Sequence, residues 1–124
     1  MKHVLIIDDE YDITRFLAGI LEDAGYKTTV AENGRKGIQR FRQDPTDLVI
    51  ADIFMPDKDG IEVICELRKE FPQVRLIAIS GGGQTGKIDF LPVAQKLGAH
   101  YTLHKPIKSK ELLQLVGKAL GEKN

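Results

Sequence analysis

The segment Asp47–Gly60 reads DLVIADIFMPDKDG and joins a short apolar run to acidic and turn-forming residues. The run at 48–51 is short and rich in β-branched side chains, which predicts a strand buried on both faces. It ends on Asp52, after which Pro56 and Gly60 help to turn the chain toward a helix. Because open α/β sheets bind ligands at the carboxyl ends of their strands, we predict that Asp52 is a reactive carboxylate.

The length and composition indicate one ordinary globular domain. The chain has 124 residues, of which 42% are hydrophobic and 29% charged. Eighteen basic residues balance eighteen acidic ones. This balance argues against nucleic-acid binding driven by a basic surface, since such binding depends on neutralising phosphates.

Cysteine content and apolar runs bear on the cellular compartment. The single cysteine, Cys65, excludes an intrachain disulfide and a multi-cysteine metal site, and we expect it to be a small hydrophobic residue in a helix. The N-terminal apolar run at 4–7 is halted by Asp8, so it is not a signal peptide. No apolar run approaches the length of a membrane span. We therefore expect a cytoplasmic protein with no membrane partner.

Hydrophobic periodicity predicts five strands alternating with five helices. The predicted strands are 4–7, 27–31, 48–51, 75–79 and 101–104. The predicted helices cover about 13–24, 37–41, 61–71, 89–97 and 109–120, with Asp89 and Ser109 as N-caps of the last two. Short connections between such elements predict a parallel sheet with helices on both faces, a doubly wound (βα)5 α/β fold. We expect one domain over 1–124 with no attached output domain.

Acidic, hydroxyl and ammonium side chains close four of the predicted strands: Asp8 and Asp9, Asp52, Ser80, and Lys105. In a flavodoxin-like sheet of order 2-1-3-4-5, the first and third strands are neighbours, which brings three carboxylates together. A hard divalent cation would relieve their repulsion, and a site with few protein ligands suits Mg²⁺ better than Ca²⁺. A lone aspartate after a strand is usually a turn former or helix cap. Together, however, these groups predict a phosphoryl site with Asp52 as the nucleophile.

At this point the chain resembles the receiver domains of two-component response regulators, in particular the stand-alone, chemotaxis-regulator-like group. The resemblance covers essentially the whole chain. It rests on six motifs, namely Ile7-Asp8-Asp9-Glu10, Asp52-Ile53-Phe54-Met55-Pro56-Asp57, Asp59-Gly60, Ser80-Gly81, Gly98-Ala99 and Lys105-Pro106.

The resemblance implies that Asp52 accepts a phosphoryl group from a sensor histidine kinase or a phosphotransfer protein. It implies Mg²⁺ as the metal, with Mn²⁺ as an alternative ion. Asp9 would bind the metal directly and Asp8 through water, with Asp52 and the backbone carbonyl of Phe54 completing the protein ligands. Such a protein is a phosphoacceptor rather than an enzyme, because it catalyses only its own phosphorylation and dephosphorylation.

Further residues take supporting roles by the same resemblance. Lys105 would pair with the phosphoryl oxygens, and Ser80 and Gly81 would contact them. A cis Lys105-Pro106 peptide is expected. Three more residues would shape the site, namely Met55, Pro56 and Gly60, while two would tune hydrolysis of the acyl phosphate, namely Phe54 and Gly82.

Two features depart from the family pattern. Thr102 stands where most relatives have an aromatic residue that changes rotamer on activation, and the neighbouring Tyr101 should face the other way on a strand. The loop after Ser80 is longer than usual and carries four glycines between 81 and 86. We hypothesise that this loop rearranges on phosphorylation.

Two rival functions remain open from the sequence. Gly81–Lys87 reads GGGQTGK and nearly matches the phosphate-cradling loop of nucleotide-binding proteins, but Ile88 replaces the hydroxyl that would bind Mg²⁺. Alternatively, the chain is a receiver-like interaction module that signals without phosphorylation. In the main interpretation the output passes through a downstream protein that the sequence does not identify.

Overall fold

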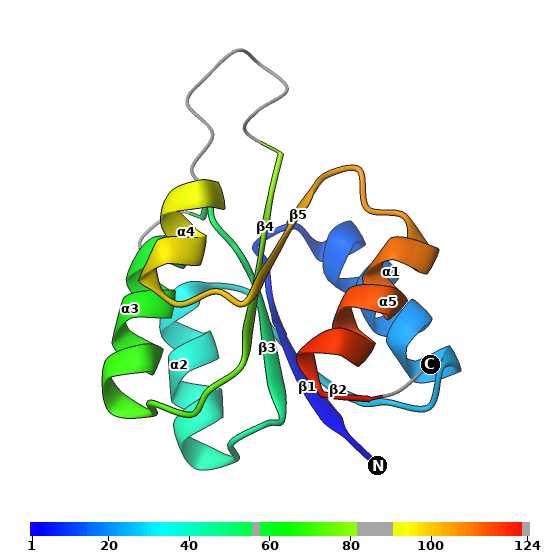
Figure 1. Cartoon of the computed structure of the whole chain (residues 1–124), viewed down its shortest axis with the longest axis horizontal. Helices are drawn as coiled ribbons and strands as arrows, with labels where there is room; N and C mark the ends of the chain where they lie inside the picture. The colour runs from blue at the N-terminus through cyan, green and yellow to red at the C-terminus, as the bar shows by residue number, and fades with distance from the viewer. Residues whose placement is uncertain (56–57, 82–90, 123–124) are drawn as a thin grey trace.

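The protein is described here by a computed structural model, which covers residues 1–55, 58–81 and 91–122. Its five strands form one parallel sheet of order β2-β1-β3-β4-β5 (Figure 1), as predicted. The strands are β1 (His3–Ile7), β2 (Lys27–Ala31), β3 (Leu48–Asp52), β4 (Leu76–Ser80) and β5 (Tyr101–His104). The helices are α1 (Tyr11–Asp23), α2 (Gly34–Gln43), α3 (Gly60–Glu70), α4 (Leu91–Leu97) and α5 (Ser109–Ala119).

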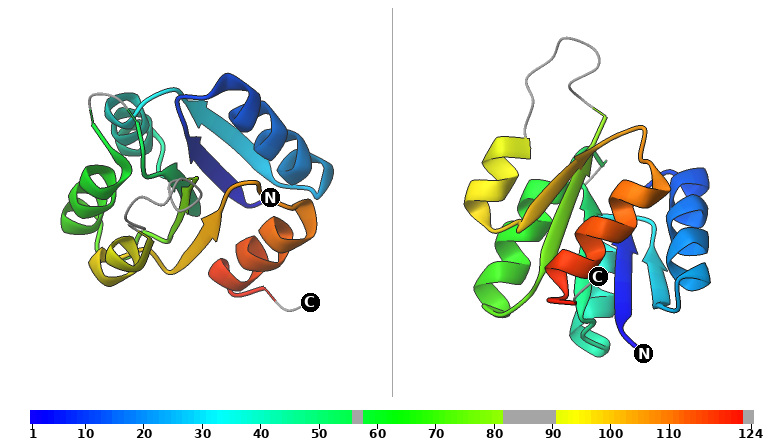
Figure 2. Two further views of the ribbon diagram at one scale, coloured as in Figure 1. Left: turned by 90° about the horizontal axis from the view of Figure 1, so that it is seen from above. Right: turned by 45° about the vertical axis from the view of Figure 1, so that its right-hand side comes forward.

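The helices cover both faces of the sheet, so the molecule has three layers. Helices α1 and α5 lie on one face, and α2, α3 and α4 lie on the other (Figures 1 and 2). Alternate residues of β1 show how the strands serve both layers, because Ile6 packs with the α1 and α5 side chains while Leu5 packs with those of α2 and α3. Two separate hydrophobic cores result, one on each face.

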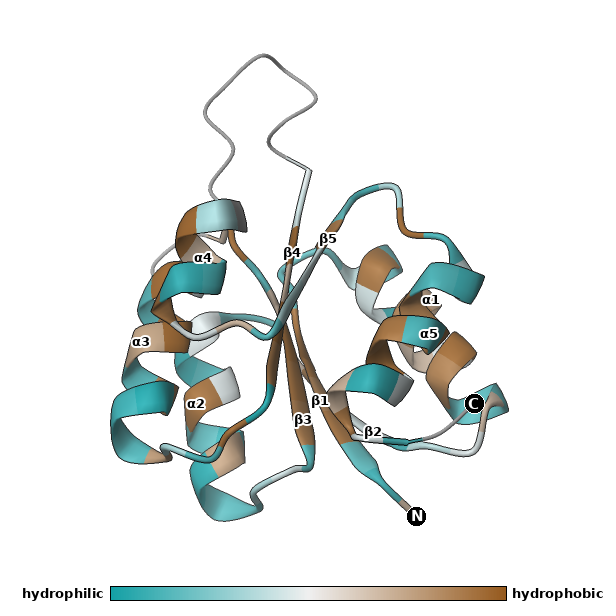
Figure 3. Ribbon diagram, viewed as in Figure 1, coloured by the Kyte–Doolittle hydropathy of each residue, from teal (hydrophilic) through white to brown (hydrophobic). Residues whose placement is uncertain are grey.

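Burial is greatest in the middle of the sheet. All five residues of β3 and all five of β4 are buried, whereas the edge strand β2 exposes Lys27 and Val30. Figure 3 shows the same contrast, with apolar central strands and hydrophilic residues along the outer sides of the helices. The apolar run at 48–51 is therefore a strand buried on both faces, as its composition predicted.

Side-chain caps fix where two of the helices begin. The Asn33 side chain accepts a hydrogen bond from the Lys36 amide at 2.8 Å and caps α2. Asp59 caps α3 and forms a reciprocal capping box with Glu62. The prediction for α5 was wrong in detail, because Lys108 occupies the N-cap position without a side-chain hydrogen bond and Ser109 is already helical.

Two other expectations concern single residues. Cys65 does lie in a helix, α3, but its side chain is exposed rather than packed in the core. The predicted cap of α4, Asp89, lies outside the described residues.

Gly60 brings the start of α3 against the end of β3. A Cβ at this position would lie 2.2 Å from the Asp52 carbonyl oxygen and 2.6 Å from the Ile53 Cα, and both neighbours are main-chain atoms. The Gly60 amide also donates a 2.8 Å hydrogen bond to the Ile53 carbonyl. Only glycine permits this contact, which agrees with the structural role predicted for Gly60 beside the site.

No helix within the described ranges has the length and apolar character needed to cross a bilayer.

Candidate functional site

The register of the parallel sheet gathers the predicted residues at one edge. Three strand pairings define that edge, namely Ile7 with Ala51, Asp52 with Ile79 and Ser80 with His104. Asp8 directly follows β1, and Asp52 and Ser80 are the last residues of β3 and β4. The Lys105 amide donates to the Ser80 carbonyl at 2.8 Å, which extends the β4–β5 pairing by one residue.

Lys105 crosses this edge and meets three carboxylates. Its Nζ lies 2.8 Å from Glu10 Oε1, 3.2 Å from Asp8 Oδ2 and 3.4 Å from Asp52 Oδ2. These acids come from two separate strand ends, and Asp52 and Lys105 are 53 residues apart in the sequence. The structure thus brings Asp8, Asp52 and Lys105 together, as the topology predicted.

Burial makes the two aspartates unusual. Asp8 is 1% exposed and Asp52 2% exposed. The pKa of Asp52 is raised from 3.8 to about 6, mainly by burial and also by the neighbouring charge of Asp8, against the opposing effect of Lys105. Burial also raises the pKa of Asp8, although the Glu10 amide, which donates to Asp8 Oδ1 at 2.9 Å, and the Lys105 charge partly offset it.

The same surroundings keep the side chain of Lys105 charged. Burial by itself would lower the pKa of Lys105. The hydrogen bond to Glu10 and the charges of Asp52 and Asp8 outweigh burial and raise that pKa above its ordinary value. Lys105 therefore carries a full positive charge beside the carboxylate that is the candidate nucleophile.

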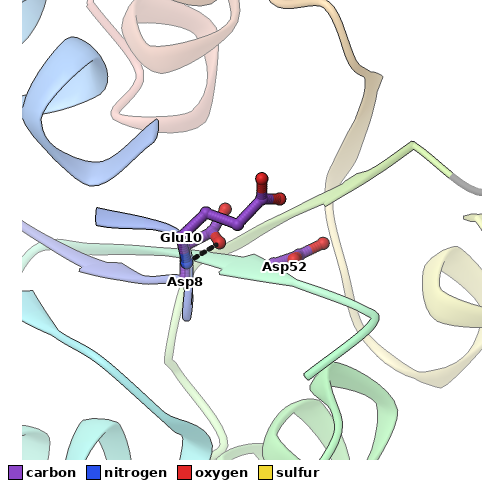
Figure 4. A group of neighbouring side chains, drawn as sticks. All are labelled: Asp8, Glu10 and Asp52. Carbon is purple, nitrogen blue, oxygen red and sulfur yellow. Dashed lines mark hydrogen bonds between the residues drawn. The ribbon is translucent and has the colours of Figure 1, made fainter. Parts of the chain in front are cut away.

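Glu10 is a member of the site to which the sequence analysis gave no role. One carboxylate oxygen from each of Asp8, Glu10 and Asp52 lies within 4.8 Å of the other two. Figure 4 shows the three side chains together. Asp9 is exposed and does not belong to this group in the described structure, so its direct binding of a metal stays a prediction. The only signal for Glu10 was its place in the acidic run after β1.

These residues fit a divalent cation. Asp8 Oδ2 and Asp52 Oδ1 are buried and make no hydrogen bond within the described residues, although Asp8 Oδ2 is ion-paired with Lys105. Buried carboxylate oxygens without hydrogen bonds are costly unless a cation binds them. Grouped oxygen ligands suit a hard ion such as Mg²⁺.

The other predicted site residues surround this centre. Ser80 is 1% exposed, and the position of a Gly81 Cβ lies 3.7 Å from the Lys105 side chain. Met55 is buried in the α2–α3 core, whereas Phe54 is 44% exposed. Their roles toward a phosphoryl group, and the Phe54 carbonyl as a metal ligand, stay predictions.

Three further predictions concern the flanking segments. The Lys105–Pro106 peptide is cis, as the resemblance implied. Pro56 and Gly82 lie outside the described residues. So does most of the 81–87 segment, and with it the nucleotide-loop interpretation and the hypothesis of a rearranging loop.

The residues at the position of the expected aromatic switch lie on β5. Tyr101 is partly buried and packs against the α1–α5 core. Thr102, which pairs in register with Ala78, borders a hollow between β5 and α5 together with Gln114 and Lys118. Tyr101 and Thr102 therefore face different surroundings, as strand alternation predicted.

Comparison with known proteins agrees with this geometry. The family model for the response regulator receiver domain matches residues 4–117. The chemotaxis protein CheY of Thermotoga maritima is 32% identical over 118 residues, which cover 94% of this chain and 96% of that protein. A putative NtrX-like response regulator of Rickettsia bellii is 34% identical over 94% of this chain. The match covers only 24% of the length of that relative.

Solved structures give the same result. A response regulator receiver domain protein from Clostridium thermocellum superposes with a TM-score of 0.89 at 28% identity, covering 98% of this chain and 95% of that one. The response regulator TrrA of Thermotoga maritima, solved in complex with Mg²⁺-BeF, gives a TM-score of 0.87 at 31% identity, covering 97% of this chain and all of that one (100%). With its strand order and its buried acidic edge, the chain belongs to the family of response regulator receiver domains.

Proposed function

We propose that this protein accepts a phosphoryl group on Asp52 from a phosphohistidine of a sensor histidine kinase or phosphotransfer protein, in a Mg²⁺-dependent reaction. The observation that carries the proposal is the Lys105 ammonium, which lies 3.4 Å from the buried Asp52 carboxylate and is shared with Asp8 and Glu10. A carboxylate beside a fixed cation, at the edge of a sheet, is suited to attack a phosphoryl group.

The reaction would join an Asp52 carboxylate oxygen to phosphorus. The phosphorus–nitrogen bond of the donor breaks, and its electron pair stays on the imidazole of the leaving histidine. Lys105 would neutralise charge on the transferred oxygens, because its backbone amide is held by the Ser80 carbonyl and its ammonium lies beside Asp52. Ser80, buried at the end of the next strand, would donate a hydrogen bond to the same group.

Asp8 and Asp52, with Asp9 and the Phe54 carbonyl as the resemblance implies, would hold Mg²⁺, which would neutralise further charge on the phosphoryl oxygens. The likeness to TrrA, whose structure contains Mg²⁺-BeF, supports this assignment. The burial of Asp8 and Asp52 supports it independently, since a bound cation would offset the repulsion between the two carboxylates.

Phosphorylation would then change the surface of this protein toward a downstream protein partner. In this role the protein is a signalling phosphoacceptor that acts only on its own aspartate. The relatives include CheY, which is of similar length, and longer NtrX-like regulators. The downstream partner is therefore proposed only as a protein, with no nucleic-acid contact by this domain.

The test is incubation of the purified protein with acetyl phosphate or phosphoramidate and Mg²⁺, followed by intact-mass analysis. We expect a gain of one phosphoryl mass, lost when the sample is treated with base and retained in acid. The gain should be absent in Asp52→Asn and in wild type treated with a chelator.

The matched control is Asp12→Asn, which removes an exposed acid from the first turn of α1. It should label as wild type does. Absence of label on the wild-type protein, or equal labelling of Asp52→Asn, would overturn the proposal and favour a module that works without phosphorylation.

A further inference from the structure

We propose that Glu10 is a positioning residue for Lys105, which assists binding of the divalent cation and opposes arrival of the phosphoryl group. The inference rests on the proposed function and deepens it, because it assigns regulation of the same site to a residue outside the predicted set. Its consequence is that the charge of Glu10 affects metal binding and phosphorylation in opposite directions.

The first observation is the order of the contacts around Lys105. The Glu10 carboxylate makes the shortest of the three, at 2.8 Å, against 3.2 Å for Asp8 and 3.4 Å for Asp52. Glu10 also differs in exposure, because its side chain is 60% exposed while those of Asp8 and Asp52 are 0% and 3% exposed. Glu10 thus holds the ammonium from the solvent side, and the aspartates hold it from within.

The second observation is that the backbone of Glu10 is fixed while its side chain is committed to Lys105. Its amide donates to Asp8 Oδ1 at 2.9 Å, and its carbonyl accepts from the amides of Ile13 and Thr14 at 3.1 Å. Glu10 occupies the N-cap position of α1, yet its side chain makes no capping hydrogen bond. The carboxylate instead accepts a hydrogen bond from Lys105 Nζ at 2.8 Å. Figure 4 shows the Glu10 side chain beside those of Asp8 and Asp52.

This arrangement bears on cation binding. In the structure Lys105 supplies the positive charge that Asp8 and Asp52 require, so it must withdraw from them to admit a divalent cation. Glu10 offers the ammonium a carboxylate to pair with once it withdraws. Its negative charge, within 4.8 Å of both aspartates, also attracts the cation directly. Removal of that charge should weaken Mg²⁺ binding on both grounds.

The effect on phosphoryl transfer should be the reverse. An incoming phosphoryl group is anionic and needs the Lys105 ammonium that Glu10 now holds. Glu10 repels that group and competes with it for the lysine. Once the metal is saturating, removal of the Glu10 charge should therefore accelerate phosphorylation.

The decisive variant is Glu10→Gln, which keeps the size of the side chain, with Asp12→Asn as the control for loss of one acid from the start of α1. Mg²⁺ affinity is measured by titration calorimetry without any phosphodonor. The phosphorylation rate is measured with phosphoramidate at saturating Mg²⁺. For Glu10→Gln we expect the Mg²⁺ Kd to rise about three- to tenfold and the rate to rise about three- to tenfold, as fits one partly screened charge pair.

A residue that merely supported the fold would lower the affinity and the rate together. Unchanged Mg²⁺ affinity, a slower rate, or equal effects in Asp12→Asn would each overturn the inference. If wild type takes up no phosphoryl group, the proposed function and the phosphoryl half of this inference both fail. The calorimetric result then decides the metal half alone.

Discussion

Two groups of ionic side chains in this protein have similar composition and opposite surroundings. At the edge of the sheet, Lys105 pairs with Asp8, Glu10 and Asp52. On the outside of the α2–α3 layer, Arg42 pairs with Glu70 at 2.7 Å and Glu66 at 3.0 Å. In the first group the two aspartates are buried and Lys105 is mostly so, whereas every member of the second is between 33% and 46% exposed.

The pKa values of the carboxylates are shifted in opposite directions in the two groups. Burial raises the pKa of Asp52 to about 6, even with Lys105 nearby. The hydrogen bond from Lys58, with the charges of Lys58 and Arg42, lowers the pKa of Glu66 and outweighs the opposing effect of burial. The exposed group therefore links two helices with little desolvation cost. The buried aspartates favour the folded state only when a positive charge, from Lys105 or a metal ion, offsets the cost of burying them.

The largest effect should follow removal of the buried cation. Lys105→Met leaves Asp8 and Asp52 buried without their ammonium partner. Loss of one member of a buried ion pair typically costs about 3–5 kcal/mol. We expect a loss of that size in the free energy of unfolding, measured by urea denaturation at pH 8 in the presence of a chelator. A loss no greater than that of an exposed-lysine variant such as Lys118→Met would show that the site is effectively solvated.

Neutralising the proposed acceptor, Asp52, should change the free energy of unfolding in the opposite direction. Because the folded pKa of Asp52 is about 6 and its ordinary value 3.8, its contribution to stability is complete below about pH 4 and is lost as the pH rises through 6. Asp52→Asn should thus stabilise the metal-free protein above pH 6, by about 3 kcal/mol at most.

The measurement is the free energy of unfolding of wild type and Asp52→Asn between pH 4 and pH 8, with chelator. The two proteins should converge toward pH 4 and separate as the pH rises. A difference that does not vary with pH would contradict the raised pKa of Asp52.

A divalent cation should compensate the buried group and leave the exposed one unaffected. At a concentration of one hundred times its Kd, a ligand that binds only the folded state adds about 2.7 kcal/mol. We expect Mg²⁺ to raise the unfolding midpoint of wild type and of Arg42→Gln equally. The rise should be largely absent in Asp8→Asn, and an equal rise there would place the metal elsewhere.

The smallest effect should come from the exposed group itself. Arg42→Gln removes the contacts to Glu66 and Glu70, but water already solvates these carboxylates. We expect a small decrease in the unfolding midpoint that disappears in 1 M salt, where screening is strong. A decrease comparable to that of Lys105→Met would remove the distinction between the two groups.

Much of the fold was predictable because local pattern and topology agree. The strands at 27–31 and 101–104 begin and end where the sequence pattern placed them. The strand order was taken from the doubly wound fold class rather than read from any residue. The error at Ser109 is local, since a serine at the start of a helix does not reveal whether its backbone is already helical.

The site was predictable to the extent that strand ends define it. Asp8, Asp52 and Lys105 each follow or end a strand, so the sheet alone brings them together. Glu10 could not be foreseen in the same way, because its contact with Lys105 joins residues 95 positions apart through a long and exposed side chain. The expectation for Cys65 was wrong for a different reason, since its residue type suggested the core although its side chain faces solvent.

The glycine at the start of α3 places the candidate acceptor, Asp52, against a helix. Gly60 donates to the Ile53 carbonyl, and its Cα leaves no room for a side chain beside the Asp52 carbonyl. Any displacement of the Asp52 main chain must therefore push directly on the first turn of α3, with no compressible layer between them. The candidate acceptor and the first turn of α3 are thus in direct main-chain contact, so a displacement of Asp52 caused by a change of charge at the sheet edge would be passed on to this helix.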